Sequence, residues 1–167
     1  SYYFPLIDRL QTIGFWEEAY EYLLTARSKW PSEAEFAYLD AKRVMENGDH
    51  EKAIQLLKIA TDRKVEEVPG DWFLLLVEAI FRQFEIDWAL ASDVCIPDEQ
   101  LLLAQKSLQN YLNLDQEIVN PEAKVYLSEI YFLTDMFVQS KAMIEAVFDD
   151  QKQNLPEREF GWRVFAD

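Results

Sequence analysis

The sequence predicts an all-α fold in which antiparallel helix pairs stack on one another. The first observation is composition: half of the 167 residues are hydrophobic and 14% are aromatic, whereas only four are Gly and six are Pro. Such a chain is too apolar to stay disordered and too poor in turn-forming residues for an all-β fold. The second observation is that apolar residues recur at spacings of three and four. The third is an internal repeat.

The first two helix pairs are expected on either side of Gly14 and Gly48. Around Gly14 the apolar residues with helical spacing are Leu6, Ile7, Leu10, Ile13, Tyr20, Leu23 and Leu24. A second pair follows Ser32 and Glu33, which suit the start of a helix, and Asp49 is placed to cap the helix that begins near His50. Four identical pairs lie 34 residues apart: Gly14 and Gly48, Ala19 and Ala53, Leu23 and Leu57, Ala26 and Ala60.

This unit of helix, tight turn and helix resembles the tetratricopeptide repeat (TPR). The family's Gly, aromatic, Ala, Ala and Pro positions are filled in order by Gly14, Trp16, Ala19, Ala26 and Pro31. In the second unit, His50 replaces the aromatic residue and Val65 stands at the Pro position. The resemblance implies a right-handed α-solenoid of about four helix pairs, in which the small alanines let the helices pack closely and large side chains such as Trp16 and Phe36 fill the gaps.

Two later units are expected from weaker matches. Leu127, Ser128 and Tyr131 resemble the family's first helix, and its second helix is matched by Phe137, Ser140, Ile144 and Val147, with Asp135 in place of the turn glycine. Upstream, Ala104–Asp115 resembles a second helix whose partner is the apolar stretch Trp72–Phe84. Extra residues near 85–99 predict an insertion between these two. Pro156 opens a last predicted helix, residues 155–167, that would cover the end of the stack.

The expected organisation is a single domain over residues 1–167. Its units are expected at about residues 1–33, 34–67, 68–120 and 121–150. The chain begins Ser1-Tyr2-Tyr3, without Met, and both ends resemble cuts inside helical patterns. We therefore interpret the chain as a fragment of a longer protein. A cytoplasmic location is favoured, and a periplasmic one stays open if a signal peptide has been removed.

The charge balance restricts the class of partner. Thirty-one Asp and Glu residues against sixteen Lys and Arg give a net charge of −15. A field of this sign repels phosphate backbones and anionic lipid surfaces, so nucleic-acid binding is not expected. No apolar run is long enough to span a bilayer, so membrane insertion is not expected either. It favours a basic partner, although acidic surfaces also keep proteins soluble.

The sequence offers no positive sign of catalysis. His50, the only histidine, stands where the family places a packing aromatic, and a metal site built on it would need further Cys or His ligands at suitable spacing. Cys95 has acidic and apolar neighbours, which favour an inert thiol. The adjacent carboxylates Glu17/Glu18, Glu66/Glu67 and Asp149/Asp150 are interpreted as solvated helix surface. We expect no cofactor, no metal and no enzyme.

The resemblance implies a protein-binding groove lined by the first helix of each pair. The groove candidates are Phe4, Asp8, Gln11, Tyr38, Lys42, Met45, Phe73, Val77, Ile80, Phe81, Val125, Glu129 and Phe132. Some family members grip a carboxylate tail with Lys and Asn on this face, but here Phe4, Asp8, Tyr38 and Lys42 stand at those places, so that clamp is not expected. The expected function is a scaffold that binds a peptide or helix of a partner, either basic or with an apolar anchor.

Two questions stay open at this point. The stretch 72–84 is apolar nearly all round, so it is either covered by the insertion, with Trp88, Leu90 and Ile96, or is an open hydrophobic site. The alternative function is a helical regulatory or accessory domain of a larger enzyme or of a secretion or assembly machine. An RNA-binding helical repeat is a third hypothesis, and the acidic charge argues against it.

Overall fold

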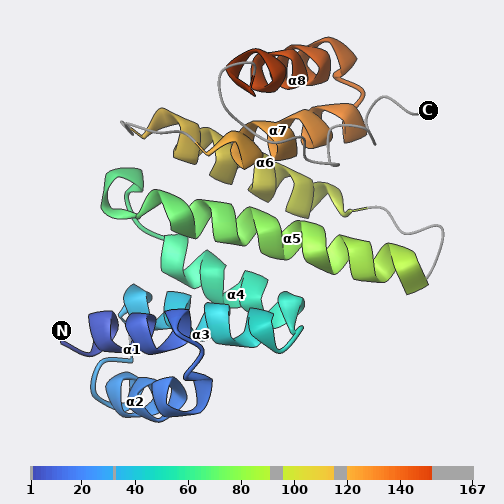
Figure 1. The fold of residues 1–167 in the computed structure, drawn as a ribbon. Coiled ribbons are helices and arrows are strands. Elements are labelled where there is room, and N and C mark those ends of the chain that lie inside the picture. Colours follow the sequence, from blue (N-terminus) through green and yellow to red (C-terminus); the bar gives the residue numbers. More distant parts are fainter. Residues whose placement is uncertain (1, 32, 91–95, 115–119, 152–167) are drawn as a thin grey trace. The chain divides into compact units, whose positions relative to one another are not determined.

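The computed structural model describes residues 2–31, 33–90, 96–114 and 120–151 (Figure 1). This part of the chain consists of α-helices and one short 3₁₀ helix, without strands, which confirms the predicted all-α class. The helices are α1 (Tyr3–Thr12), α2 (Trp16–Lys29), α3 (Ala34–Glu46), α4 (His50–Thr61), α5 (Gly70–Leu90), α6 (Asp98–Asn113), α7 (Pro121–Leu133) and α8 (Phe137–Gln151), with the 3₁₀ helix at Val65–Glu67.

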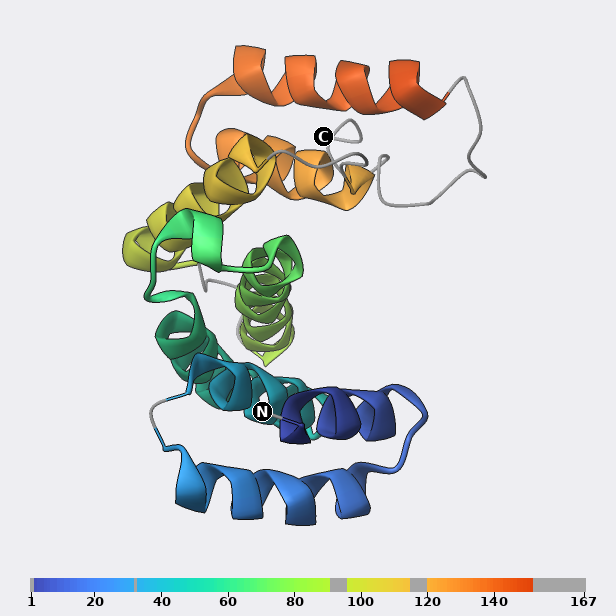
Figure 2. The same cartoon turned by 90° about the vertical axis from the view of Figure 1, so that its left-hand side faces the viewer.

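The chain divides into two compact units, which are described separately: unit 1 ends at Ile96 and unit 2 begins at Pro97. In unit 1, α1 and α2 form an antiparallel pair, and so do α3 and α4 (Figure 2). Helix α3 packs against both helices of the preceding pair, and α4 packs against α5. This nearest-neighbour packing is how a helical repeat extends its core from one pair to the next. The single continuous domain expected from the sequence stays a prediction.

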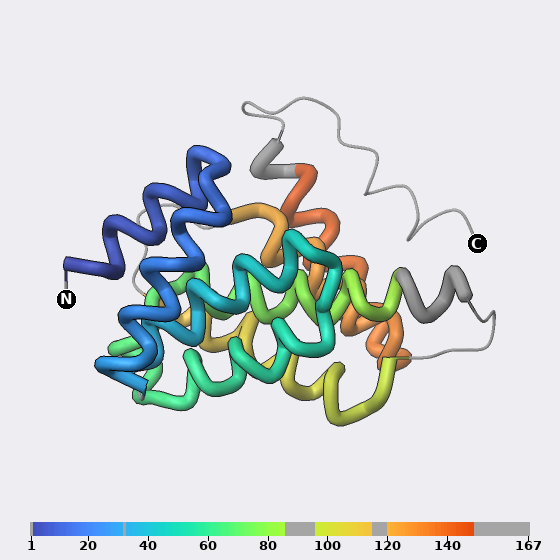
Figure 3. The backbone as a smooth tube through the Cα atoms, turned by 90° about the horizontal axis from the view of Figure 1, so that it is seen from below, coloured from blue at the N-terminus to red at the C-terminus, as the bar shows by residue number. Residues whose placement is uncertain are grey.

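The four repeated alanines lie in the core of unit 1. Ala19, Ala26, Ala53 and Ala60 are all fully buried, as their small size at close helix contacts requires. Phe36 and Leu39 of α3 are buried, as are Leu23 and Leu57, the apolar residues that repeat in the second helices. Burying a large side chain of this kind contributes about 1.5–3 kcal/mol, so these residues supply much of the stability of each pair. Figure 3 shows how the helices of unit 1 follow one another along the chain.

Three turns between paired helices each contain one residue in the left-handed conformation. The φ angle is 86° at Gly14, 79° at Gly48 and 59° at Asp135. The backbone amide of the residue that follows each of these donates a hydrogen bond to a carbonyl in the preceding helix. The bonds run from Phe15 N to Leu10 O at 2.9 Å, from Asp49 N to Val44 O at 2.9 Å, and from Met136 N to Tyr131 O at 2.7 Å. This is the helix-ending motif that a left-handed residue permits. The structure thus confirms that Asp135 replaces the turn glycine.

In unit 2, α6 packs against α7, and α7 and α8 form the antiparallel pair. Ser128 and Ser140, which take the small positions of the two helices, are buried at 0% and 2% exposure. The Ser128 hydroxyl lies 3.0 Å from the Ser140 carbonyl oxygen and 3.1 Å from the Ser140 hydroxyl. Asn120 caps α7 by accepting the Glu122 amide at 2.9 Å. Small polar residues therefore replace the usual Gly and Ala at this helix contact by pairing with each other.

Helix α5 extends into the predicted insertion. It continues past Phe84 to Leu90, so the beginning of the segment near 85–99 is helical. The sequence from Glu85 to Leu90 carries no Gly or Pro that would stop the helix. Residues 91–95, Ser32 and the predicted last helix at 155–167 lie outside the described residues. Asp49 does cap α4, since its carboxylate accepts the Lys52 amide at 3.2 Å.

Candidate protein-binding surfaces

The first surface is the first-helix face of unit 1, which we define by Phe4, Asp8, Tyr38, Lys42 and Trp72. Asp8 of α1 and Lys42 of α3 form an ion pair at 2.8 Å. The Lys42 ammonium also lies 5.8 Å from the ring centroid of Tyr38, one turn earlier in α3. A cation at this distance is attracted to the ring face. The ion pair therefore joins α1 to α3, and the Tyr38 ring contacts the Lys42 ammonium within α3.

Tyr38 of α3 also contacts two residues of α5. Its ring stacks on that of Trp72, with centroids 4.7 Å apart and planes 13° from parallel. Its hydroxyl donates a hydrogen bond to the Asp71 carboxylate at 3.0 Å. Burial raises the pKa of Tyr38, and the negative charge of Asp71 raises it further. Tyr38 is therefore a neutral hydrogen-bond donor that holds two first helices together.

The predicted groove residues differ widely in exposure. Phe4, Asp8 and Lys42 are half-buried, whereas Tyr38 and Met45 are buried at 7% exposure each. Gln11 is buried and donates from its side-chain amide to the Leu39 carbonyl at 2.9 Å. In α5 the predicted residues are all buried: Phe73, Val77, Ile80 and Phe81. In unit 2, Val125 and Glu129 are half-buried, and Phe132 is 41% exposed.

The burial of the α5 side chains bears on whether the apolar stretch 72–84 is an open hydrophobic site or is covered. Because Phe73, Val77, Ile80 and Phe81 are at most 4% exposed, a partner would reach them only after a rearrangement. Ile96, at the end of the predicted insertion, is also buried. The side chains of Trp88 and Leu90 lie outside the described part of the chain, as does Cys95. The role of α5 residues in partner binding stays a prediction.

Sequence reasoning missed Trp72 as a member of the first-helix face and named its neighbour Phe73 instead. Phe4, Tyr38 and Trp72 are spaced by one repeat length each, so the repeat register alone identifies Trp72. Helix α5 is apolar on most sides, and its periodicity does not show which residue points to a given face.

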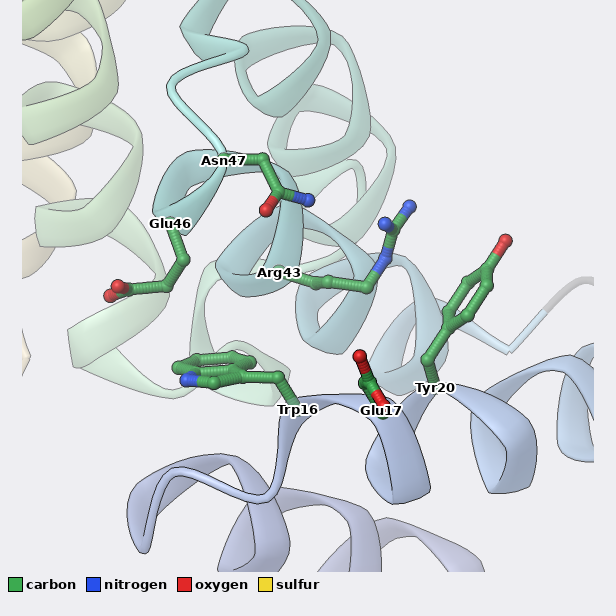
Figure 4. Close-up of a pocket in the computed structure, with 6 residues that line it drawn as sticks. All are labelled: Trp16, Glu17, Tyr20, Arg43, Glu46 and Asn47. Carbon is green, nitrogen blue, oxygen red and sulfur yellow. The ribbon is translucent and has the colours of Figure 1, made fainter.

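The second surface is a pocket of about 380 Å³ between the start of α2 and the end of α3 (Figure 4). The residues that line it are Trp16, Glu17, Tyr20, Arg43, Glu46 and Asn47. In the close-up the Arg43 side chain extends from α3 towards Tyr20, and the Trp16 indole lies at the opposite end, near Glu46. The guanidinium carbon of Arg43 is 4.2 Å from the Tyr20 ring centroid. We call this space the α2–α3 pocket.

Asp40 fixes the position of the Arg43 guanidinium through a hydrogen-bonded ion pair. The Arg43 Nε donates to Asp40 Oδ1 at 3.1 Å, and Arg27 of α2 pairs with the other carboxylate oxygen. The Asp40 side chain is only 4% exposed. A carboxylate buried between two guanidinium groups has its charge compensated, and it fixes the two arginines in return. This triad connects the second helix of one pair to the first helix of the next.

The residues considered for catalysis are His50 and the adjacent carboxylates, and the side chains of Asp149 and Asp150 lie outside the described part of the chain. His50 is buried at 6% exposure at the start of α4, and its Nδ1 has no hydrogen-bond partner among the described residues. Burial lowers the pKa of His50, and the charge of Arg82 lowers it further, while Asp49 and Glu78 act in the opposite direction. Glu17, Glu18, Glu66 and Glu67 are exposed. Within the described ranges no three His, Cys, Asp or Glu residues are grouped to hold a metal ion.

No helix of the described part of the chain is long and apolar enough to cross a membrane. No protein-family model matches the sequence, and no curated protein matches it. Among solved structures, the crystal structure of MamA matches with a TM-score of 0.62 and 19% sequence identity, over 86% of this chain and 72% of that chain. At this identity the likeness concerns the fold, and it shows that the chain has a TPR-like, all-α helical-repeat fold of the solenoid class.

Proposed function

We propose that this chain is a non-catalytic scaffold that binds a peptide or helix of a partner protein through the first-helix face. The observation that carries the proposal is the row of contacts at equivalent repeat positions: Asp8 pairs with Lys42, and Tyr38 stacks on Trp72. These contacts fix the side chains of α1, α3 and α5 before any partner arrives. A preorganised surface loses less conformational entropy on binding, so more of the contact energy appears as affinity.

Trp72 and Tyr38 are only 2% and 7% exposed, so they support this face from below, and its accessible members are Phe4, Asp8 and Lys42. Phe4 is half-buried and offers an aromatic edge, and Asp8 retains 41% exposure of its side chain while paired with Lys42. Aromatic residues are enriched at protein interfaces, and charged residues near the rim contribute mainly to partner selection. In unit 2, Phe132 of α7 is the corresponding exposed aromatic, and its ring lies edge-on to Phe137 at 5.5 Å.

The proposal is tested by site-specific photocross-linking in extract of the source cell. A photoreactive phenylalanine analogue replaces Phe4 in one variant and Ile59 in a control; Ile59 lies on α4 and is 61% exposed. We expect one discrete adduct from position 4 and none of the same mass from position 59. Adducts of equal yield from both positions, or from position 59 alone, would overturn the assignment of the first-helix face.

A charge exchange gives an independent test. In the double variant Asp8→Lys/Lys42→Asp the ion pair is retained with its partners swapped, so the fold is kept while the charge pattern of the face is inverted. The control exchange Glu51→Lys/Lys52→Glu swaps one acidic and one basic residue at exposed positions of α4, so the net charge is likewise unchanged. The first variant should lose the adduct formed from position 4, and the second should retain it. Retention in both variants would contradict recognition through these charges.

A further inference from the structure

We propose that the α2–α3 pocket binds an arginine side chain of a partner protein. The proposal goes beyond the first-helix face, because it concerns a second surface on other residues and names the chemistry of the group bound. It rests on three features of the pocket: an aromatic wall, two carboxylates that are not paired within the described chain, and an arginine that already stacks on one of the pocket's rings.

The carboxylates are those of Glu17 and Glu46, which approach the pocket from α2 and α3. Both are exposed, and neither forms an ion pair with any described residue. Glu46 is the last residue of α3, where the partial negative charge of the helix end adds to its own. Glu17 lies in the first turn of α2. The pocket therefore holds two anions and attracts a cation.

Arg43 neutralises these carboxylates only in part. Its guanidinium is paired with Asp40, which lies outside the pocket lining, through contacts of 3.1 Å. Asp40 is shared with Arg27, so the three residues together keep one positive charge, and with the carboxylates of Glu17 and Glu46 the local sum is one negative charge. The net charge of −15 for the chain adds a long-range attraction for a basic partner.

The aromatic wall selects arginine among the cations. The indole of Trp16 is half-buried and borders the pocket near Glu46 (Figure 4). On the other side of the pocket, Arg43 lies over the Tyr20 ring at 4.2 Å, which shows that the geometry of these helices accommodates a guanidinium against an aromatic face. A planar guanidinium stacks on a ring and donates to two carboxylates at once, whereas an ammonium is more strongly hydrated and does not stack. The Asn47 side chain offers a further acceptor.

The size of the pocket agrees with this ligand. A space of about 380 Å³ that is open to solvent accommodates one long side chain with the adjoining backbone. We therefore place the arginine on an extended segment of the partner, with flanking residues resting on α2 and α3.

The test is a titration of the whole ¹⁵N-labelled chain with the peptide acetyl-Gly-Arg-Gly-amide, followed by NMR. The reporters are the Trp16 indole N–H, assigned with Trp16→Phe, and the Asn47 side-chain amide. We expect a saturable shift of both signals below about 10 mM peptide, because a single exposed side chain binds weakly. The analogue with citrulline keeps the shape but lacks the charge, and should shift neither signal. An absent Trp16 shift, or an equal shift with citrulline, would overturn the proposal.

Matched variants separate the pocket from general charge. Glu17→Gln/Glu46→Gln should weaken binding of the arginine peptide about fivefold or more. Glu18→Gln/Glu21→Gln removes the same charge from exposed positions of α2 outside the pocket, and should bind like the parent. Equal weakening in both variants would show attraction by net charge and refute the pocket. Because the peptide is supplied, this result is independent of cross-linking from position 4, and either proposal can fail while the other stands.

Discussion

Asp8 and Lys42 occupy the same position in consecutive repeats, 34 residues apart, and their side chains form an ion pair of 2.8 Å between α1 and α3. This ion pair joins the first helix of one repeat to the first helix of the next, on the face where we propose that a partner binds. The pair is partly open to solvent, with side-chain exposures of 41% for Asp8 and 23% for Lys42. Because the pair is partly exposed, we expect it to contribute little to the free energy of unfolding while it remains accessible to a partner.

We predict that Asp8→Asn lowers the free energy of unfolding by no more than about 1 kcal/mol, since solvent and salt weaken an exposed ion pair. Urea denaturation of the parent, Asp8→Asn, Lys42→Met and the double variant gives the coupling energy directly. A coupling well above about 2 kcal/mol would mean that the pair is a structural contact rather than a recognition feature.

Asp40 should behave in the opposite way. Its carboxylate is buried and accepts from both Arg27 of α2 and Arg43 of α3. Asp40→Ala removes these charge-assisted bonds and leaves Arg43, at 20% side-chain exposure, without its anion. We expect a loss of about 2–3 kcal/mol in the free energy of unfolding.

Chemical denaturation checks this prediction, with Glu51→Ala on the exposed surface of α4 as the matched loss of a carboxylate. The control should stay within about 0.5 kcal/mol of the parent. If Asp40→Ala were as stable as Glu51→Ala, the triad would not connect the two helix pairs energetically.

The features of the fold that the sequence predicted are those with a strict steric requirement. Gly14 and Gly48 adopt positive φ, a conformation that residues with a Cβ rarely adopt, and Ala19, Ala26, Ala53 and Ala60 are fully buried at helix contacts where a larger side chain would overpack. Ser140 takes an alanine position for the same reason. These requirements repeat with the unit and are therefore visible without any structure.

The features that the sequence did not predict depend on contacts between residues far apart in the chain. Nothing near Asp40 in the sequence shows that Arg27 reaches it from another helix. Trp16 was expected to fill the space between pairs, but it is half-buried and borders an open pocket, because the pocket depends on how the start of α2 meets the end of α3. The sequence analysis named only the apolar stretch 72–84 of α5, because after Phe84 the apolar pattern weakens although the helix continues to Leu90.

We next predict that Ala19→Trp destabilises unit 1. Ala19 is fully buried in α2, so an indole added there overpacks the contact between helices and costs about 1–3 kcal/mol or more. Ala53→Trp at the equivalent position of α4 should act in the same way. Glu21→Trp, on the exposed side of α2, tests whether the bulk of tryptophan alone has an effect. Thermal unfolding at the parent's midpoint for either buried variant would show that the repeat register is wrong.

The last prediction concerns the pH dependence caused by His50. The pKa of His50 in the folded chain lies below its ordinary value of 6.5, chiefly because of burial and then because of Arg82, with Asp49 and Glu78 opposing the shift. Above pH 6.5 the imidazole is neutral in both folded and unfolded chains and adds no pH dependence. Below that pH the unfolded chain binds a proton that the folded chain does not, so the free energy of unfolding falls until the folded pKa is reached.

The measurement compares the free energy of unfolding at about pH 7.5 and about pH 5.5, a window above the ordinary pKa of carboxylates. The parent should lose stability on acidification, and His50→Gln, which cannot be protonated, should lose less. His50 is the only histidine in the chain, so the difference between the two proteins isolates this residue. An equal loss in both would mean that His50 protonates as readily in the folded chain as in the unfolded one. A larger loss in the variant would reverse the sign of the argument, because His50 would then be stabilised in its charged form by Asp49 and Glu78.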